Sequence, residues 1–160
     1  MKIQKLTLED SLSIDFECIA IHSSIEDYQL AYLINKHLNL KLKRTKEDLD
    51  IHNGHYKFPL FEWHDLKYQN KWNLISNYIF EEVAEIPTKQ ELFGEQIIQI
   101  KKQSLIPELK QIEYFLRLDQ SSNYIDLLSV IKVLNSIPQI VTSYKLDLKK
   151  LKHIEHLTLE

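Results

Sequence analysis

The sequence LIPELKQIEYFLRL, residues 105–118, carries the strongest structural signal in this chain. Pro107 fixes its own φ and biases Ile106 towards extended geometry, so residues 106–108 predict a turn and not the interior of a helix. From Gln111 the side chains alternate between two faces, which predicts a β-strand. One face is expected to point into the core and carries Ile112, Tyr114, Leu116 and Leu118. The other is expected to be a half-covered sheet surface or a protein interface and carries Glu113, Phe115 and Arg117.

A strand, a helix and a second strand are predicted before residue 45. Residues 14–22 are an apolar run with β-favouring side chains on both faces, which predicts a central strand covered on both sides. Ser24 is placed to cap a helix, with Asp27 three residues on, and the helix is expected to end near Asn39. Its predicted buried stripe is Tyr28, Ala31, Tyr32, Asn35 and Leu38. Residues 40–44 then complete a β-α-β unit.

A second β-α-β unit is predicted to begin with the strand at residues 111–118. Asn123 is placed to cap its helix, with Asp126 at the third position, and Ile137-Pro138 ends it. The predicted buried stripe is Tyr124, Leu127, Leu128, Ile131 and Leu134. A strand at 139–144 and a short terminal helix at 147–153 are expected to follow.

The middle of the chain predicts an aromatic hairpin. Residues 56–64 and 71–80 are rich in aromatic side chains and are separated by a polar stretch, and Pro59 favours an edge or a bulge. Residues 81–104 are expected to be an insertion, with a helical turn after Thr88 and a short strand at 96–100. We therefore predict an α+β fold whose mixed, mainly antiparallel sheet is built from two β-α-β units around the hairpin, with the helices on one face.

Length and composition favour one domain without a polyanionic partner. A chain of 160 residues with 44% hydrophobic content is long enough for one domain, residues 1–160, with a real core. A net charge of −3 and a sequence pI near 6.2 provide no global attraction to nucleic acid or to an anionic membrane. The single Cys18 excludes an internal disulfide, and its apolar surroundings predict a buried, inert thiol.

No targeting or membrane segment is predicted. The N-terminal sequence MKIQKLTLEDSLSIDF has acidic residues where a secretory signal requires an apolar region. The longest apolar runs are far shorter than the roughly 18 residues of a membrane span. We expect a cytoplasmic protein that does not enter a membrane.

The spacing Ile106-Pro107-Glu108, three residues, then Ile112-Glu113-Tyr114 resembles the signature of the IPExxxVDY family of small bacterial proteins from Bacteroidota. Ile112 stands where that signature has Val, and Glu113 stands where it has Asp. The run DFECIAIHSSIEDYQLAYLINKHLNL, residues 15–40, is similar to the opening strand and helix of the family. The resemblance implies a housekeeping role in the cytoplasm and a motif of unknown role at Pro107, Glu108, Glu113 and Tyr114. It implies no activity.

Several kinds of site are excluded by the residues. The chain has two glycines, Gly54 and Gly94, too few for the phosphate loops of nucleotide-binding proteins, and it contains no Gly-x-Ser-x-Gly sequence. His52 and His55 with Asp48 or Asp50 could hold a metal ion, but histidines in a turn are better interpreted as solvated. We interpret His153 and His156 in the same way, and predict no metal and no cofactor.

Two function classes besides protein binding stay open. RNA binding would use two basic clusters, Lys41, Lys43, Arg44 and Lys46 in one and Lys149, Lys150 and Lys152 in the other. The lack of an RNP-like sequence argues against it. An enzyme or ligand-binding domain would use Glu108 and Glu113, with Asp119 as a further acid, in a pocket where they meet Tyr114. The alternative for these two acids is structural, with Glu108 holding the turn and Glu113 pairing with a cation.

The favoured prediction is a non-enzymatic protein that binds another protein or itself. Aromatic residues are concentrated in the hairpin, more than a small exposed sheet would carry. The candidate interface is Phe61, Trp63, Trp72 and Phe115. The competing interpretation is that these rings fill the core of the domain itself.

Overall fold

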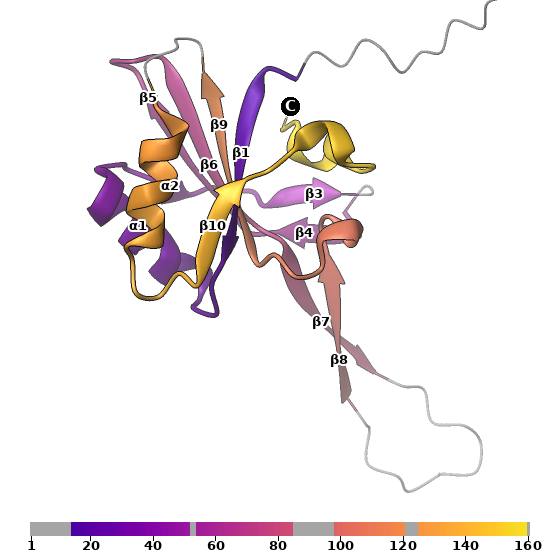
Figure 1. Cartoon of the computed structure of the whole chain (residues 1–160). Coiled ribbons are helices and arrows are strands. Elements are labelled where there is room, and N and C mark those ends of the chain that lie inside the picture. Colours follow the sequence, from indigo (N-terminus) through magenta and orange to yellow (C-terminus); the bar gives the residue numbers. More distant parts are fainter. Residues whose placement is uncertain (1–13, 52–53, 85–97, 121–124, 160) are drawn as a thin grey trace, which may run out of the picture.

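The fold is built on a six-stranded sheet in the order β10-β1-β9-β6-β5-β2, in which every neighbouring pair is antiparallel (Figure 1). The computed structural model describes residues 14–51, 54–84, 98–120 and 125–159. The strands of this sheet are β1 (Phe16–His22), β2 (Lys43–Arg44), β5 (Leu60–Asp65), β6 (Asn70–Ser76), β9 (Tyr114–Gln120) and β10 (Thr142–Lys145). The structure confirms an α+β fold with mainly antiparallel sheets.

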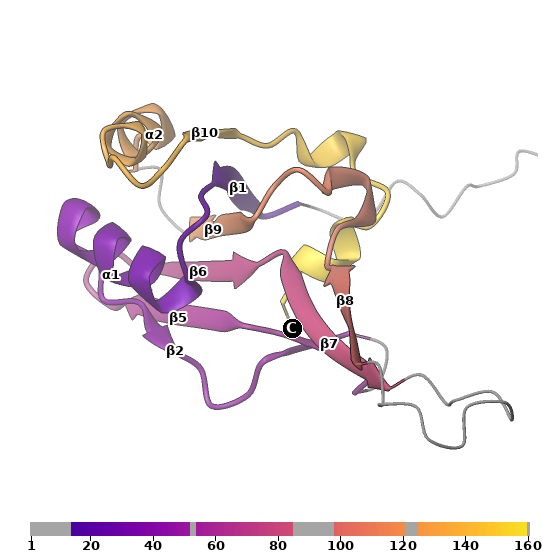
Figure 2. The same cartoon turned by 90° about the horizontal axis from the view of Figure 1, so that it is seen from below.

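Both helices, α1 (Asp27–Leu38) and α2 (Leu127–Asn135), cover the same face of the sheet (Figure 2). α2 connects β9 to β10, and these two strands are parallel because each is antiparallel to β1 between them. α1 connects β1 to β2. These two strands are also parallel, because the sheet order β1-β9-β6-β5-β2 contains four successive antiparallel pairings between them, which is an even number. Each helix therefore crosses over strands that come from elsewhere in the chain.

The helix-side core lies between the helices and the sheet. Its most buried members are Ile19, Ile21, Leu30, Ile34, Leu74, Leu116, Leu118, Leu134 and Ile137. The start of each helix differs from the prediction. Glu26, and not Ser24, is the N-cap of α1, and Asp126 caps α2 by accepting a hydrogen bond from the N–H of Leu128. Asn123 and Tyr124, the predicted cap and first stripe residue of that helix, lie outside the described residues.

The buried stripes are also corrected. Tyr28 and Tyr32 are 62% and 65% exposed, and Leu128 is 74% exposed, although all three were predicted to be buried. α1 buries Leu30, Ala31 and Ile34 instead, and α2 buries Val130 and Leu134. Tyrosine and leucine at helical spacing do not reveal which face meets the sheet, because each helix carries apolar residues on more than one face.

A second core, the far-side core, covers the opposite face of the sheet. The hairpin of β3 (Leu49–Ile51) and β4 (Tyr56–Phe58) and the 3-10 turns η3 (Leu148–Lys150) and η4 (Ile154–Leu157) lie over this face. The predicted half-covered surface of β9 is therefore wrong, because Phe115 is fully buried and Arg117 is 5% exposed. Arg117 Nη1 donates to Asp119 at 2.8 Å, and its guanidinium lies 4.2 Å from the centre of the Phe16 ring.

The predicted aromatic interface is corrected as well. Phe61 and Trp72 are buried in the helix-side core, Trp63 packs against that core, and Phe115 lies in the far-side core. Phe61, Trp72 and Phe115 are internal and Trp63 is half-buried, because both faces of the sheet are covered, as the competing interpretation of the sequence held.

The hairpin of β5 and β6 is confirmed, but β5 begins later than predicted, at Leu60, and β6 ends earlier, at Ser76. Pro59 separates β4 from β5, and Asn77 separates β6 from β7 (Tyr78–Ala84). β7 pairs with β8 (Ile98–Ser104) as a two-stranded ribbon that projects from the body of the protein (Figure 1). Residues 98–100 of the short strand expected at 96–100 belong to β8, while residues 96–97 and the helical turn expected after Thr88 lie outside the described residues.

An asparagine near the end of each helix holds the strand that follows. The side chain of Asn35 donates to the carbonyl of Leu42 at 3.0 Å and accepts from its N–H at 2.8 Å. Asn135 does the same to Ser143, donating at 3.2 Å and accepting at 2.7 Å. Each side-chain amide makes the two backbone hydrogen bonds that a neighbouring strand would otherwise make. Both β-α-β connections therefore end in the same kind of contact.

We expect alanine at Asn35 or Asn135 to lower the free energy of unfolding by about 1 to 2 kcal/mol each, because both backbone groups of the next strand lose a partner. Chemical denaturation followed by circular dichroism measures this loss. Lys36→Ala and Lys132→Ala, exposed positions on the same helices, are the controls and should change stability by less than about 0.5 kcal/mol. A loss no larger than that of the controls would contradict a holding role for the asparagines.

Candidate functional site

Asn77 organises the segment that precedes β9. Its side chain is fully buried, donates to the carbonyls of Leu109 at 3.0 Å and Ile112 at 2.7 Å, and accepts from the N–H of Ile106 at 2.9 Å. Its own backbone accepts from Leu105 and donates to Glu113, each at 2.8 Å. Pro107 begins the 3-10 turn η2 (Pro107–Leu109), as a proline-anchored turn predicts. One asparagine thus fixes the course of residues 105–113.

Sequence reasoning missed Asn77. Residues 71–80 were interpreted as one strand, and an asparagine inside a strand pattern carries no mark that separates a buried clamp from a surface position. Only its partners, which lie about thirty residues later in the chain, reveal its role.

Glu108 fastens the C-terminal segment to this turn. One carboxylate oxygen accepts from the N–H of Lys152 at 2.8 Å and of His153 at 3.0 Å, and the other lies 2.7 Å from Nδ1 of His153. Nδ1 of His156 lies 2.7 Å from the carbonyl oxygen of Leu105. The interpretation of these two histidines as solvated is therefore wrong for His156, whose side chain is 13% exposed, whereas the side chain of His153 is 41% exposed. Both contact the turn and hold the segment that covers the far-side core.

These contacts change the acidity of Glu108. Burial raises its pKa, but hydrogen bonds from its own backbone, from His153 and from Lys152 together outweigh burial and lower the pKa from 4.5 to about 2. A carboxyl group that stays ionised to such low pH is suited to holding backbone N–H groups and is poorly suited to proton transfer near neutral pH.

We expect Glu108→Gln to be less stable than the unmodified protein by about 1 to 2 kcal/mol above pH 4.5, after allowance for solvent screening. Because folding lowers the pKa of this group, its contribution is present above pH 4.5 and disappears as the pH falls towards 2. Urea denaturation at a series of pH values measures the difference. Glu47→Gln, at an exposed position, should behave like the unmodified protein. A difference between Glu108→Gln and the unmodified protein that does not shrink on acidification would contradict this role.

Glu113 and Tyr114 point away from Glu108. Oε2 of Glu113 accepts from the N–H of Ser23 at 3.3 Å and lies 3.5 Å from Nδ1 of His22. The hydroxyl of Tyr114 donates to the carbonyl of Ile25 at 2.6 Å, and burial, with the nearby acids of the α1 start and Glu113, raises its pKa. Both residues tie β9 to the loop between β1 and α1.

A hollow of about 720 Å³ lies beside this loop and forms the candidate site. Its wall is built from the start of α1, the end of the β3–β4 hairpin, β7 and the start of β9, and Glu113 and Tyr114 line it. Glu108 does not line it, so the structure separates the two acids that an enzyme would have used together. Asp119 is paired with Arg117 on the far side of the sheet.

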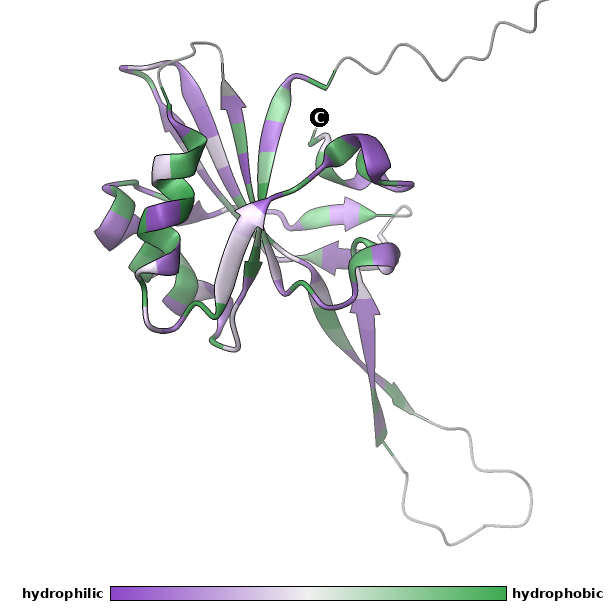
Figure 3. Ribbon diagram, in the orientation of Figure 1, coloured by the Kyte–Doolittle hydropathy of each residue, from purple (hydrophilic) through white to green (hydrophobic). Residues whose placement is uncertain are grey.

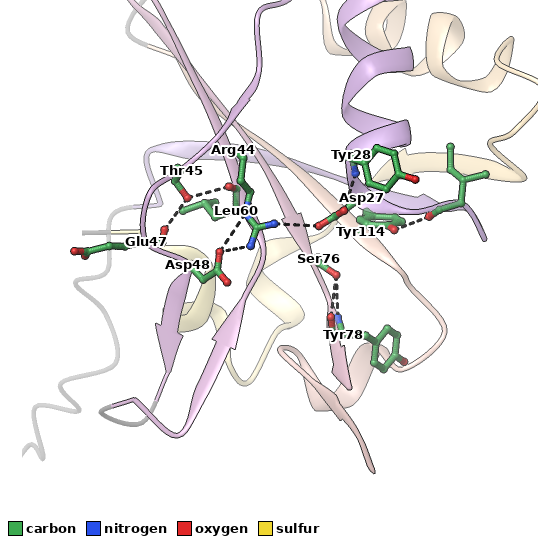
Figure 4. Close-up of polar contacts among 11 residues, drawn as sticks. Asp27, Tyr28, Arg44, Thr45, Glu47, Asp48, Leu60, Ser76, Tyr78 and Tyr114 are labelled. Carbon is green, nitrogen blue, oxygen red and sulfur yellow. Dashed lines mark hydrogen bonds and ion pairs between the residues drawn. The ribbon is translucent and has the colours of Figure 1, made fainter. Parts of the chain in front are cut away.

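The rim of the hollow carries a slight excess of acidic side chains. The carboxylates that line it are Glu26, Asp27, Glu81 and Glu113, and the lysines are Lys57 and Lys102. Arg44 reaches from β2 to both Asp48 and Asp27, as the close-up shows (Figure 4). Counting Arg44 beside Asp27, four carboxylates face three cations, so a cationic group is favoured over an anionic one.

The ribbon continues one wall of the hollow outwards. Residues directly opposite each other on β7 and β8 share a face, so Phe80 and Lys102, Glu82 and Ile100, and Ala84 and Ile98 lie on one side. Phe80 and Ile100 are each 70% exposed and Ile98 is 59% exposed. Hydropathy colouring shows apolar residues on both strands of the ribbon (Figure 3). We call this side the ribbon face.

Metal ligation and thiol chemistry find no support in the geometry. Among the residues that the structure describes, no group of three or more His, Cys, Asp or Glu is placed to hold a metal ion. His55 lines the hollow, and His52 lies outside the described residues. Cys18 is fully buried, and burial raises the pKa of its thiol to about 12, as expected of an inert cysteine.

The predicted basic clusters are partly neutralised by acids. Arg44 pairs with Asp48 and Asp27, and Lys150 lies 3.4 Å from Asp147. Short charge runs with local partners are typical of a solvated surface.

Comparison with family models found no match, and comparisons with curated proteins and with solved structures found none either. Within the described ranges, no helix is long and apolar enough to cross a membrane.

Proposed function

We propose that this protein works by binding another protein chain through the ribbon face, whose large exposed apolar side chains are Phe80, Ile98 and Ile100. The observation that carries the proposal is the exposure of these three side chains, 59% to 70%, together on one face of a projecting ribbon. Large apolar side chains gathered on an exposed face mark interaction surfaces, whereas single exposed ones are ordinary.

The composition of the ribbon suits a protein partner. Glu82 and Lys102 alternate with the apolar side chains on the same face, so apolar groups and charges of both signs lie next to one another. Protein interfaces combine apolar and polar contacts in this way. Lys102 Nζ lies 3.6 Å from the centre of the Tyr78 ring, which keeps this lysine against the base of the ribbon.

The site of binding differs from the one predicted from sequence, while the class of function is the same. The rings first chosen as an interface are buried or half-buried, and exposed apolar residues of the ribbon take their place. The cytoplasmic location and membership of the IPExxxVDY family remain part of this proposal.

Affinity capture with the purified protein as bait tests the proposal. The bait is compared with a double variant, Phe80→Glu with Ile100→Glu, in a lysate of the source cells, and bound proteins are identified by mass spectrometry. We expect a partner that is retained by the unmodified protein and lost from the double variant. The matched control is Leu128→Glu, an equally exposed apolar residue on α2, which should retain it.

Sedimentation of the purified protein and of the same variants distinguishes a second copy from a different partner. Dimerisation abolished by the ribbon variant would identify the partner as the protein itself. A monomer that captures the same proteins with and without the ribbon substitutions would overturn the proposal.

A further inference from the structure

We propose that an extended, basic segment of a partner protein adds as a strand to the outer edge of β7, beside the hollow. This inference rests on the proposed function and names the chemistry of the partner. It follows from the hydrogen bonding of the ribbon, from the residues of β7 that line the hollow, and from the charge of its rim.

The outer edge of β7 carries backbone groups that β8 does not use. In an antiparallel pair, hydrogen-bonded and non-hydrogen-bonded residues alternate along each strand. The N–H of Leu105 donates to the carbonyl of Asn77 at 2.8 Å, which places the odd-numbered residues of β7 in the hydrogen-bonded set. Phe80 and Glu82 therefore direct their N–H and C=O groups away from β8.

Tyr78 shows the same orientation independently. The hydroxyl of Ser76 donates to the carbonyl of Tyr78 at 3.0 Å and accepts from its N–H at 3.4 Å (Figure 4). Both backbone groups are thus bonded outside the β7–β8 ladder. A side chain thus satisfies the first outward-facing residue of β7. The next two, Phe80 and Glu82, have no such partner among the described residues.

The hollow lies along this edge. Four consecutive residues of β7, from Tyr78 to Glu81, line it. Successive side chains of a strand point to opposite faces, so a hollow lined by four in a row borders the edge of the strand and not one face. The space beside the free backbone groups is therefore open to a further strand.

The surroundings select the chemistry of that strand. Side chains on one face of it would meet Phe80 and Glu82, and those on the other face would meet Ile79 and Glu81. Each face of β7 therefore offers an apolar side chain beside a carboxylate, and Glu113 adds a further carboxylate to the rim of the hollow. Strand addition obtains affinity from main-chain hydrogen bonds and specificity from side chains, so a segment that carries apolar and basic residues fits this edge better than one that carries acids.

A labelled peptide of five Val-Lys repeats is the probe, measured by fluorescence anisotropy against the full chain in about 0.15 M salt. The comparison is a peptide of five Val-Glu repeats. We expect the basic peptide to bind at least tenfold more tightly than the acidic one, and equal binding of the two would overturn the choice of a basic segment.

Two variants at one position separate backbone from charge. Glu82→Pro removes an outward-facing N–H without removing a hydrogen bond to β8, and it should weaken binding at least tenfold. Glu82→Gln removes the charge and keeps the N–H, and it should weaken binding no more than threefold. Equal effects of the two variants would overturn the proposal.

Amide hydrogen exchange of the unmodified protein gives a readout that does not depend on a variant. The amides of Phe80 and Glu82 should exchange at least tenfold more slowly with saturating peptide, whereas those of Ile79 and Glu81 should already be slow without it. Unchanged exchange at Phe80 and Glu82 would overturn strand addition. If partner capture still depends on Phe80 and Ile100 in that case, the ribbon face stands and only the strand-addition proposal fails.

Discussion

Replacing Asn77 with alanine is expected to lower the free energy of unfolding by about 3 to 4 kcal/mol. The variant leaves the N–H of Ile106 and the carbonyl of Ile112 buried without their partner. Each such group costs about 1 to 3 kcal/mol. The carbonyl of Leu109 suffers less, because it also accepts from the N–H of Ile112 at 3.1 Å. Urea denaturation followed by tryptophan fluorescence measures the loss.

The neighbouring Ser76→Ala is the control for Asn77. It removes a single hydroxyl that contacts the backbone of Tyr78 in a half-buried position, so we expect a loss below about 1 kcal/mol. Asn77→Asp keeps the oxygen that accepts from Ile106 but loses both donated hydrogen bonds. Its free energy of unfolding should be at least as low as that of Asn77→Ala. If the free energy of unfolding of Asn77→Ala lies within about 1 kcal/mol of that of the unmodified protein, the Asn77 side chain does not stabilise the turn at residues 105–113 as proposed.

Phe115→Ala is expected to cost about 3 to 5 kcal/mol, the range for removing a fully buried aromatic ring from a core. The ring is 0% exposed and packs in the far-side core. The measurement is the midpoint of chemical denaturation, with the denaturant dependence unchanged if the variant still unfolds in two states.

Phe80→Ala provides the matched comparison for Phe115. This ring is 70% exposed on the ribbon face, so its removal should alter stability by less than about 0.5 kcal/mol while reducing capture of a partner. A small loss of stability in Phe115→Ala together with a large loss in Phe80→Ala would contradict the assignment of Phe115 to the core and of Phe80 to the surface.

Local patterns along the chain identified most of the regular elements. Alternation predicted β9, apolar content predicted a strand at residues 14–22 covered on both sides, and Pro107 predicted a turn, because each of these signals acts within a few residues. The buried inert thiol of Cys18 followed from the same local apolar pattern.

The candidate site was predicted less well. Glu113 and Tyr114 were singled out and do line the hollow, but Glu108 belongs to a separate contact with the C-terminal segment. The partners of Glu108 lie more than forty residues away in the chain, so no local pattern could have paired them.

The amino-acid sequence determined the α+β class, the strand-forming segments and the proline turn, because propensity and periodicity depend on near neighbours. The tertiary structure alone decided which surfaces are exposed. Phe115 and Arg117 became internal because distant segments cover the far side of the sheet, and Phe80 and Ile100 became surface because β7 and β8 leave the body after Asn77. Whether a side chain is buried depends on which other segments pack against it, and this is a property of the whole fold.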